Sequence, residues 1–154
     1  MRNILIILIP IIICFLVGCA SQNFQEDSMV SWYPYLCKSP LTPHNIVFPV
    51  AWSLLYLLMG LSIGLFVISD KAQKKYFILL FALQLFFNFT WSIAFFYLEN
   101  PLLGLINIIL LDFLIIYYAI KMYPVSKISS ILFFPYILWV GFATYLNLYI
   151  FLYN

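Results

Sequence analysis

The chain has 154 residues, of which 66% are hydrophobic and only 8% are charged, whereas soluble domains contain about 45–50% apolar and about 25% charged residues. A chain of this length could not bury so much apolar surface in a water-soluble core, and its net charge of +2 and its three cysteines argue against a nucleic-acid-binding protein and against a disulfide-stapled scaffold. The composition therefore predicts a protein that spans the membrane several times.

Five apolar segments are long enough to cross a bilayer, which takes about 20 residues of α-helix. In chain order they cover residues 4–20, 46–68, 76–98, 101–122 and 128–152. A long loop, residues 21–45, separates the first two, and the other connections are short, which makes consecutive helices antiparallel neighbours. The predicted fold is a single all-α membrane domain over residues 1–154: a five-transmembrane-helix bundle with a long loop between helices 1 and 2.

Lysine and arginine are concentrated in the segments that would lie on one side of the membrane. These residues are Arg2 before helix 1, Lys71, Lys74 and Lys75 after helix 2, and Lys121 and Lys127 after helix 4. Only Lys38, in the long loop, lies on the other side. Because cytoplasmic loops carry the excess of these residues, the N-terminus is predicted to be cytoplasmic. A prokaryotic cytoplasmic membrane is the expected location, with the mitochondrial outer membrane as the alternative.

The first helix has a second interpretation. Arg2, followed by an apolar run and Leu16-Val17-Gly18-Cys19, resembles a bacterial lipoprotein signal, in which the cysteine is lipidated after cleavage. A retained helix is favoured, because the charge asymmetry is satisfied with the helix in place. Its removal would also leave the other four helices without one packing neighbour.

Polar and aromatic side chains recur at helical spacing inside three of the segments. At about 100° per residue, single faces carry Trp52 and Tyr56 in helix 2, Gln84, Asn88 and Trp91 in helix 3, and Trp139, Ala143 and Asn147 in helix 5. Gln84 and Asn147 are interpreted as interhelical hydrogen-bond partners, and the tryptophans either as interfacial anchors or as the sides of a slot for a flat apolar ligand. In that slot, Asn88 would orient the ligand.

The other ionisable groups do not form a catalytic or metal-binding set. Asp112 lies near the middle of helix 4 and is interpreted as a hydrogen-bonded structural residue. His44 is the single histidine and has no cysteine or carboxylate motif beside it, which does not support Ser-His-Asp catalysis or zinc binding. Without a glycine-rich phosphate loop, nucleotide-driven transport is also unsupported. We expect no metal and no resident cofactor.

Three long motifs are spread from residue 32 to residue 147. They are Trp32-Tyr33-x-x-Leu36-x-Lys38 with Phe48-Pro49-Val50-Ala51-Trp52-Ser53-Leu54-Leu55-Tyr56, then Gln84-Leu85-x-x-Asn88-x-x-Trp91-Ser92-x-x-Phe95-Phe96, and finally Pro135-Tyr136-x-x-Trp139-x-x-Phe142-Ala143-Thr144-Tyr145-Leu146-Asn147. In content and in order they resemble the TspO/MBR family of tryptophan-rich sensory proteins and translocator proteins, also known as peripheral-type benzodiazepine receptors.

The resemblance implies a five-helix bundle, usually dimeric, with a pocket beneath the first loop. Proteins of that family bind porphyrins, haem and sterol-like or benzodiazepine-type ligands. Transferred by motif, the ligand-binding residues are Trp32, Tyr33, Trp52, Tyr56, Asn88, Trp91, Trp139 and Ala143. Some members need the tryptophans that correspond to Trp52 and Trp139 to degrade protoporphyrin in light.

Two departures from the family pattern affect the expected ligand. Lys38-Ser39 and Pro43-His44 replace the usual Lys-Pro and Pro-Pro pairs, which predicts a less rigid loop over the pocket. No lysine or arginine follows Tyr149, so the cholesterol motif of animal members is incomplete.

The sequence therefore predicts a membrane protein that binds tetrapyrroles in an aromatic pocket and serves in their transport, sensing or disposal. The alternatives are an enzyme that degrades protoporphyrin with light and oxygen through Trp52 and Trp139, a sterol- or lipid-binding translocator, and a structural bundle that acts through a partner protein.

Overall fold

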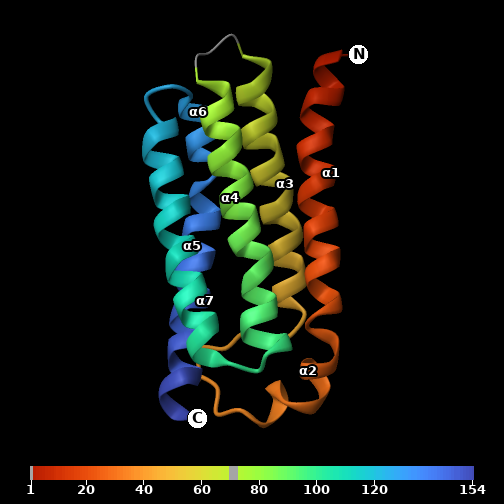
Figure 1. The fold of residues 1–154 in the computed structure, drawn as a ribbon, viewed down its shortest axis with the longest axis vertical. Helices are drawn as coiled ribbons and strands as arrows, with labels where there is room; N and C mark the ends of the chain where they lie inside the picture. Colours follow the sequence, from red (N-terminus) through yellow and green to blue (C-terminus); the bar gives the residue numbers. More distant parts are fainter. Residues whose placement is uncertain (1, 70–72) are drawn as a thin grey trace.

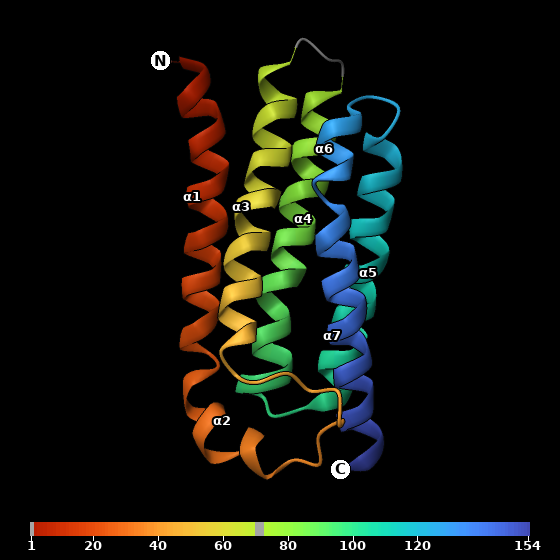
Figure 2. The ribbon, with the colours of Figure 1, turned by 180° about the vertical axis from the view of Figure 1, so that it is seen from behind.

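The computed structural model describes residues 2–69 and 73–154 as a helical bundle (Figures 1 and 2). Its elements are α1 (Arg2–Asn23), α2 (Glu26–Ser31), the 3₁₀ turn η1 (Tyr33–Tyr35), α3 (Val47–Ile68), α4 (Lys74–Ser92), the π-helical turn η2 (Ile93–Tyr97), α5 (Pro101–Met122), α6 (Lys127–Ile131) and α7 (Phe134–Tyr153). With α4 continued by η2 and α6 by α7, five segments are long and apolar enough to span a membrane. The predicted five-helix membrane bundle is confirmed.

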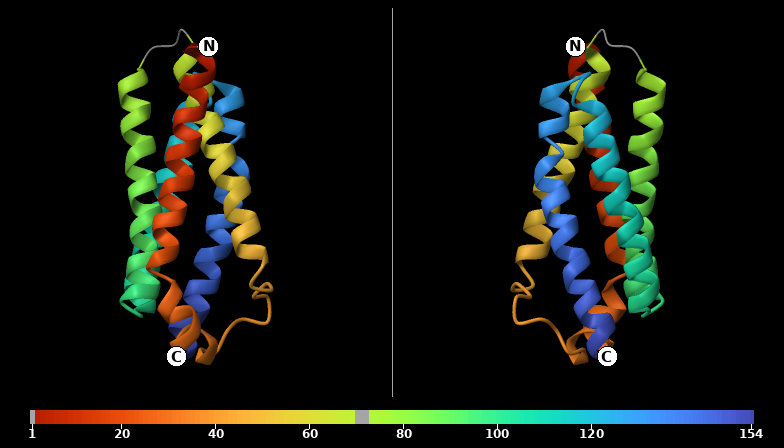
Figure 3. Two further views of the ribbon diagram at one scale, coloured as in Figure 1. Left: turned by 90° about the vertical axis from the view of Figure 1, so that its right-hand side faces the viewer. Right: turned by 90° about the vertical axis from the view of Figure 1, so that its left-hand side faces the viewer.

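The five long helices form a ring in the order α1, α3, α7, α5, α4. The start of α1, the end of α3, the start of α4 and the α5–α6 connection lie at one end of the bundle, and the α1–α3 loop and the C-terminus lie at the other (Figures 1 and 3). The lysine-bearing segments near α4 and α6 thus share an end, as predicted. Lys71, which the same prediction used, lies outside the described residues.

Two glycines allow α1 and α3 to pack backbone against backbone. A Cβ atom added at Gly60 would lie 2.5 Å from Cα of Ile11, and one at Gly64 would lie 2.8 Å from Cα of Ile7. Small residues four apart are the usual means by which membrane helices approach this closely, because lipid offers no hydrophobic drive for association. In Figure 3, α1 and α3 diverge from this contact towards the end that bears the loop.

The third spanning segment ends in a widened turn. The backbone N–H of Leu98 donates to the carbonyl of Ile93 at 2.9 Å, five residues earlier, and Glu99 then takes a left-handed conformation at φ 48°. A π-turn adds a residue to the helix circumference and is frequent at functional sites. Here it places the consecutive side chains of Phe95 and Phe96 both in the interior.

The fifth spanning segment differs from the single helix predicted over residues 128–152. It consists of α6 and α7, separated at Leu132 and Phe133. Pro135 lies at the start of α7, and a proline ring there lacks an N–H donor and clashes with the carbonyl four residues earlier, at Ile131, where α6 ends.

The loop between α1 and α3 is partly helical and is attached to the end of α7. It contains α2 and η1, and α1 itself extends three residues beyond the predicted segment end at residue 20. The Asn154 side chain accepts a hydrogen bond from the backbone N–H of Cys37 at 2.8 Å and donates to its carbonyl at 3.2 Å. Further along, the Ser39 and Tyr145 hydroxyls are 2.9 Å apart. The loop therefore covers one end of the bundle, and a cavity lies directly beneath it.

Candidate functional site: an intramembrane cavity

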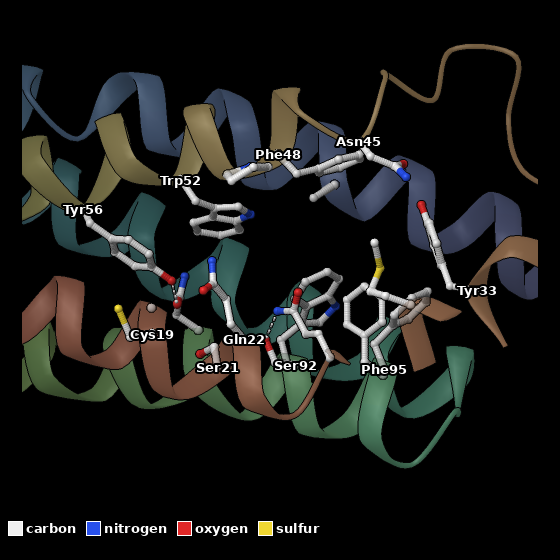
Figure 4. Close-up of a pocket in the computed structure, with 18 of the residues that line it drawn as sticks. Cys19, Ser21, Gln22, Tyr33, Asn45, Phe48, Trp52, Tyr56, Ser92 and Phe95 are labelled. Carbon is white, nitrogen blue, oxygen red and sulfur yellow. Dashed lines mark hydrogen bonds between the residues drawn. The ribbon is translucent and has the colours of Figure 1, made fainter. Parts of the chain in front are cut away.

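A cavity of about 360 Å³ lies at the loop end of the bundle, among α1, α3, α4, η2 and α7 (Figure 4). Its size falls within the range of about 300–1,000 Å³ typical of small-molecule sites. Figure 4 shows Trp52 and Tyr56 of α3 on one side and Ser21 and Gln22 of α1 on the other, with Tyr33 at the loop end. The cavity begins beyond the close approach at Gly60 and Gly64, and Gly18 of α1, against which the Tyr56 ring packs, lines it.

Two pairs of parallel aromatic rings line the cavity. On α3, the ring centres of Trp52 and Tyr56 are 5.6 Å apart and their planes are 29° from parallel. On α4 and η2, the ring centres of Trp91 and Phe95 are 5.5 Å apart at 16°. Offset stacks of this kind favour a flat, polarisable ligand that can continue them. We call these four rings the aromatic faces.

A chain of hydrogen bonds runs from the cavity into the bundle interior. Tyr56 Oη donates to Asn88 Oδ1 at 3.1 Å, Asn88 Nδ2 donates to Tyr136 Oη at 3.0 Å, and Tyr136 Oη donates to Gln84 Oε1 at 3.0 Å. All four side chains are buried. The chain fixes the orientation of the Asn88 amide, which keeps one N–H and one lone pair for a ligand.

A second polar connection joins α4, α5 and α7. Trp91 Nε1 donates to Asn147 Oδ1 at 3.1 Å, and Asn147 Nδ2 donates to the carbonyl of Pro101 at 2.8 Å. Together with the Gln84 contact, this confirms the prediction that Gln84 and Asn147 are interhelical hydrogen-bond partners. The bond also holds the Trp91 ring in position beside Phe95.

The end of α1 supplies uncharged polar groups opposite the Trp52 ring. Ser21, Gln22, Gln25 and Ser92 line this side, which we call the polar wall. Gln25 Nε2 donates to Ser92 Oγ at 2.8 Å, which ties the residues after α1 to the end of α4. None of the described residues that line the cavity is Asp, Glu, Lys, Arg or His, so the lining itself presents dipoles and no formal charge.

The loop end of the cavity is bounded by Tyr33. The ammonium of Lys38 lies 4.8 Å from the centre of the Tyr33 ring and donates to the carbonyls of Tyr33 and Pro34 at 2.9 and 3.1 Å. Burial raises the pKa of the Tyr33 phenol above its ordinary value, so the hydroxyl stays protonated at neutral pH. Lys38 thus places one positive charge close to an otherwise uncharged site.

The structure brings six of the eight predicted ligand-binding residues together around the cavity. They are Tyr33, Trp52, Tyr56, Asn88, Trp91 and Ala143. The other two contact phenylalanines that line it: the ring centre of Trp32 is 5.5 Å from that of Phe95, and the ring centre of Trp139 is 6.0 Å from that of Phe48. Trp52 and Trp139, expected to close around one slot, are therefore not equivalent, and ligand contact by any of these residues stays a prediction.

Two further predicted residues lie away from the cavity lining. Asp112 is half-buried on α5 and accepts a hydrogen bond from Thr144 Oγ1 at 2.6 Å, in agreement with a structural role. His44 is exposed in the loop. Within residues 2–69 and 73–154, no group of three or more His, Cys, Asp and Glu side chains could hold a metal ion.

Several lining residues were not predicted from the sequence. On α1 they are Phe15, Gly18, Cys19, Ser21 and Gln22, and Gln25 follows the helix. The polar composition after Ala20 predicts a loop, whereas the helix continues to Asn23 and brings these side chains to the cavity. Of the two cysteines on α1, Cys14 is buried, whereas Cys19 is exposed and lines the cavity.

Comparison with known proteins agrees with the motifs and the fold. A sequence model described as the TspO/MBR family matches residues 10–153. The chain is 38% identical over 157 aligned residues to "Tryptophan-rich protein TspO" of Archaeoglobus fulgidus, covering 99% of each protein. It is 34% identical over 148 residues to the protein of the same name from Chlorobaculum tepidum, covering 95% of this chain and 94% of the relative. "Translocator protein 2" of Mus musculus is 25% identical over 139 residues, with 88% and 80% covered.

Proposed function

The chain belongs to the TspO/MBR family, and from that membership and the geometry of its cavity we propose that it binds porphyrins and haem inside the membrane. Its proposed role is the transport, sensing or disposal of these tetrapyrroles. The observation that carries the proposal is the pair of aromatic faces. A planar macrocycle placed between them stacks on rings from two helices, and Asn88 offers it a hydrogen bond in a position that Tyr56 and Tyr136 hold.

The proposal also covers the membrane in which the protein lies and its oligomeric state. The family is one of membrane proteins, and relatives from Chlorobaculum tepidum and Archaeoglobus fulgidus cover nearly the whole chain, which supports a prokaryotic cytoplasmic membrane. A homodimer is proposed on the resemblance alone. Sterol-like and benzodiazepine-type ligands are the alternative occupants of the same cavity.

Binding is tested by titrating the purified protein in detergent with protoporphyrin and following the porphyrin absorption band, which does not depend on the protein's tryptophans. Trp52→Leu removes a ring that lines the cavity, and loss of one aromatic stack should weaken binding about three- to tenfold. Trp139→Leu is the comparison variant, because Trp139 contacts the lining residue Phe48 without lining the cavity itself and should therefore cost less affinity than Trp52. Equal losses in both variants, or no saturable change with the unmodified protein, would contradict the proposed site.

Competing ligand classes are separated by thermal unfolding. A ligand that binds only the folded state stabilises it by about 2.7 kcal/mol at a hundredfold excess over its dissociation constant. At the same free ligand concentration, protoporphyrin and haem should raise the melting temperature more than a sterol does, because they bind more tightly. A larger shift with the sterol would favour the sterol-binding translocator, and no shift with any of them would favour the bundle that acts through a partner protein.

Light-dependent degradation of a bound porphyrin is a second candidate, favoured by one observation: the oxidisable indole of Trp52 lines the cavity. Illumination in air would then bleach protoporphyrin faster with the unmodified protein than with Trp52→Leu at equal occupancy. The proposal that Trp139 acts in the same step predicts the same loss in Trp139→Leu. Equal bleaching in all three proteins would remove the enzymatic interpretation.

A further inference from the structure

The end of α1 carries a hydroxyl group that is buried in the cavity wall without a hydrogen-bond partner. Ser21 is 4% exposed, and its Oγ has no partner within the described chain. Serines in helices commonly donate to the carbonyl four residues earlier, as Ser53 does to Pro49 at 2.8 Å. A buried hydroxyl that makes no such bond costs free energy, and an unsatisfied group of this kind in a native structure calls for a partner.

Its neighbours on the polar wall are also uncharged hydrogen-bonding groups. Gln22 extends from α1 towards Trp52 across the cavity in Figure 4. Ser92 Oγ accepts from Gln25, so its own O–H remains available as a donor. Three side chains on this side of the cavity thus keep hydrogen-bonding capacity and carry no net charge.

We propose that Ser21, Gln22 and Ser92 form a subsite that binds an uncharged hydrogen-bonding substituent, a hydroxyl or a carbonyl, on a flat apolar ligand that lies on Trp52. A carboxylate is excluded at this position, because it would be buried without a counter-ion. The carboxylates of an acidic ligand point instead towards the loop end, where the Lys38 ammonium lies 4.8 Å from the centre of the Tyr33 ring. The inference rests on the cavity proposed above as the ligand site, and it specifies which edge of the ligand lies against the polar wall.

The test uses two fluorescent probes that differ by one hydroxyl, 1-pyrenemethanol and 1-methylpyrene. Binding to the detergent-solubilised full chain is measured by energy transfer from tryptophan to pyrene. Ser21→Ala should weaken binding of 1-pyrenemethanol about three- to tenfold and leave 1-methylpyrene unchanged. Ser31→Ala is the matched control, because that serine does not line the cavity and donates its hydroxyl to the carbonyl of Asp27, four residues earlier, at 2.8 Å. It should change neither affinity.

The stability of the ligand-free variant provides an independent measurement. Removing an unpaired buried hydroxyl leaves the melting temperature of Ser21→Ala equal to or above that of the unmodified protein. A lower melting temperature would mean that Ser21 already has a partner, and the inference would be wrong.

The probe pair also separates this inference from the proposed function. If protoporphyrin binds but Ser21→Ala affects both pyrenes equally or neither, the subsite is wrong and the proposed function stands. If protoporphyrin does not bind but the hydroxyl preference disappears in Ser21→Ala, the subsite stands and the porphyrin proposal is wrong.

Discussion

An alanine at Gly60 should push α1 away from α3. The added Cβ would lie 2.5 Å from Cα and 2.7 Å from the backbone N of Ile11. Carbon atoms make their best contacts at about 3.5–4.0 Å, and a backbone atom cannot rotate aside as the end of a side chain can. The helices must therefore separate by roughly 1 Å in the contact that holds α1 in the ring.

The size of the effect follows from two opposing terms. Overpacking of this kind costs about 1–3 kcal/mol. Replacing glycine by alanine in a helix also gains about 0.8–1 kcal/mol. Gly141→Ala on α7 is the control that isolates the first term, because a Cβ at Gly141 meets no atom within 4 Å. Since the helix-propensity gain is common to both, Gly60→Ala should be about 1–3 kcal/mol less stable than Gly141→Ala.

The comparison is made by unfolding both variants under the same conditions, with SDS titrated into a mild detergent. A porphyrin titration on the same samples reports whether the displaced α1 also loosens the cavity. If the two variants unfold at the same SDS fraction, the close approach at Gly60 does not constrain α1, and the account of how this helix is held is wrong.

Three further predictions concern single side chains. Tyr136→Phe removes the hydroxyl that links Asn88 to the bundle interior and should cost about 1–3 kcal/mol of unfolding free energy, whereas an unchanged melting temperature would show that the hydrogen-bond chain is dispensable. Asp112→Asn keeps a side-chain oxygen that can accept the hydrogen bond from Thr144 and removes an ionisable acid from the membrane. The melting temperature should therefore stay equal or rise, and a clear decrease would contradict the structural role of Asp112. In a Cys37→Ser background, bound protoporphyrin should slow alkylation of Cys19, the exposed cysteine that lines the cavity, and equal rates with and without it would place the ligand elsewhere.

The membrane-spanning segments could be predicted because their signal is local. A bilayer requires about 20 apolar residues in succession, and the chain supplies five such runs with few charges inside them. The polar stripe of α4 was equally local: Gln84, Asn88 and Trp91 repeat at helical spacing, and all three form bonds to α7. Residues that share a helix face can be placed from the sequence without knowledge of the partner helix.

Features that depend on contacts between helices could not be placed in this way. Trp139 and Ala143 share a face of α7, yet only Ala143 lines the cavity, because Trp139 contacts Phe48 from the start of α3. The contribution of α1 was missed for a similar reason. Ser21 and Gln22 follow the apolar run, and only the packing of α1 along α3 shows that the helix continues far enough to turn them inward.

With the proposed subsite on it, α1 would be both a structural and a ligand-binding element, which would couple its packing to binding. Gly60 and Gly64 hold α1 against α3 at one end, and the polar wall faces Trp52 at the other. A ligand that bonds to Ser21 while stacking on Trp52 bridges the same two helices that the glycines join. By linkage it stabilises the folded state in proportion to the logarithm of its concentration. Saturating 1-pyrenemethanol should therefore stabilise the Gly60→Ala protein less than the unmodified protein, since the displaced α1 weakens the bridge, and equal stabilisation would show that packing at Gly60 and binding at the polar wall are independent.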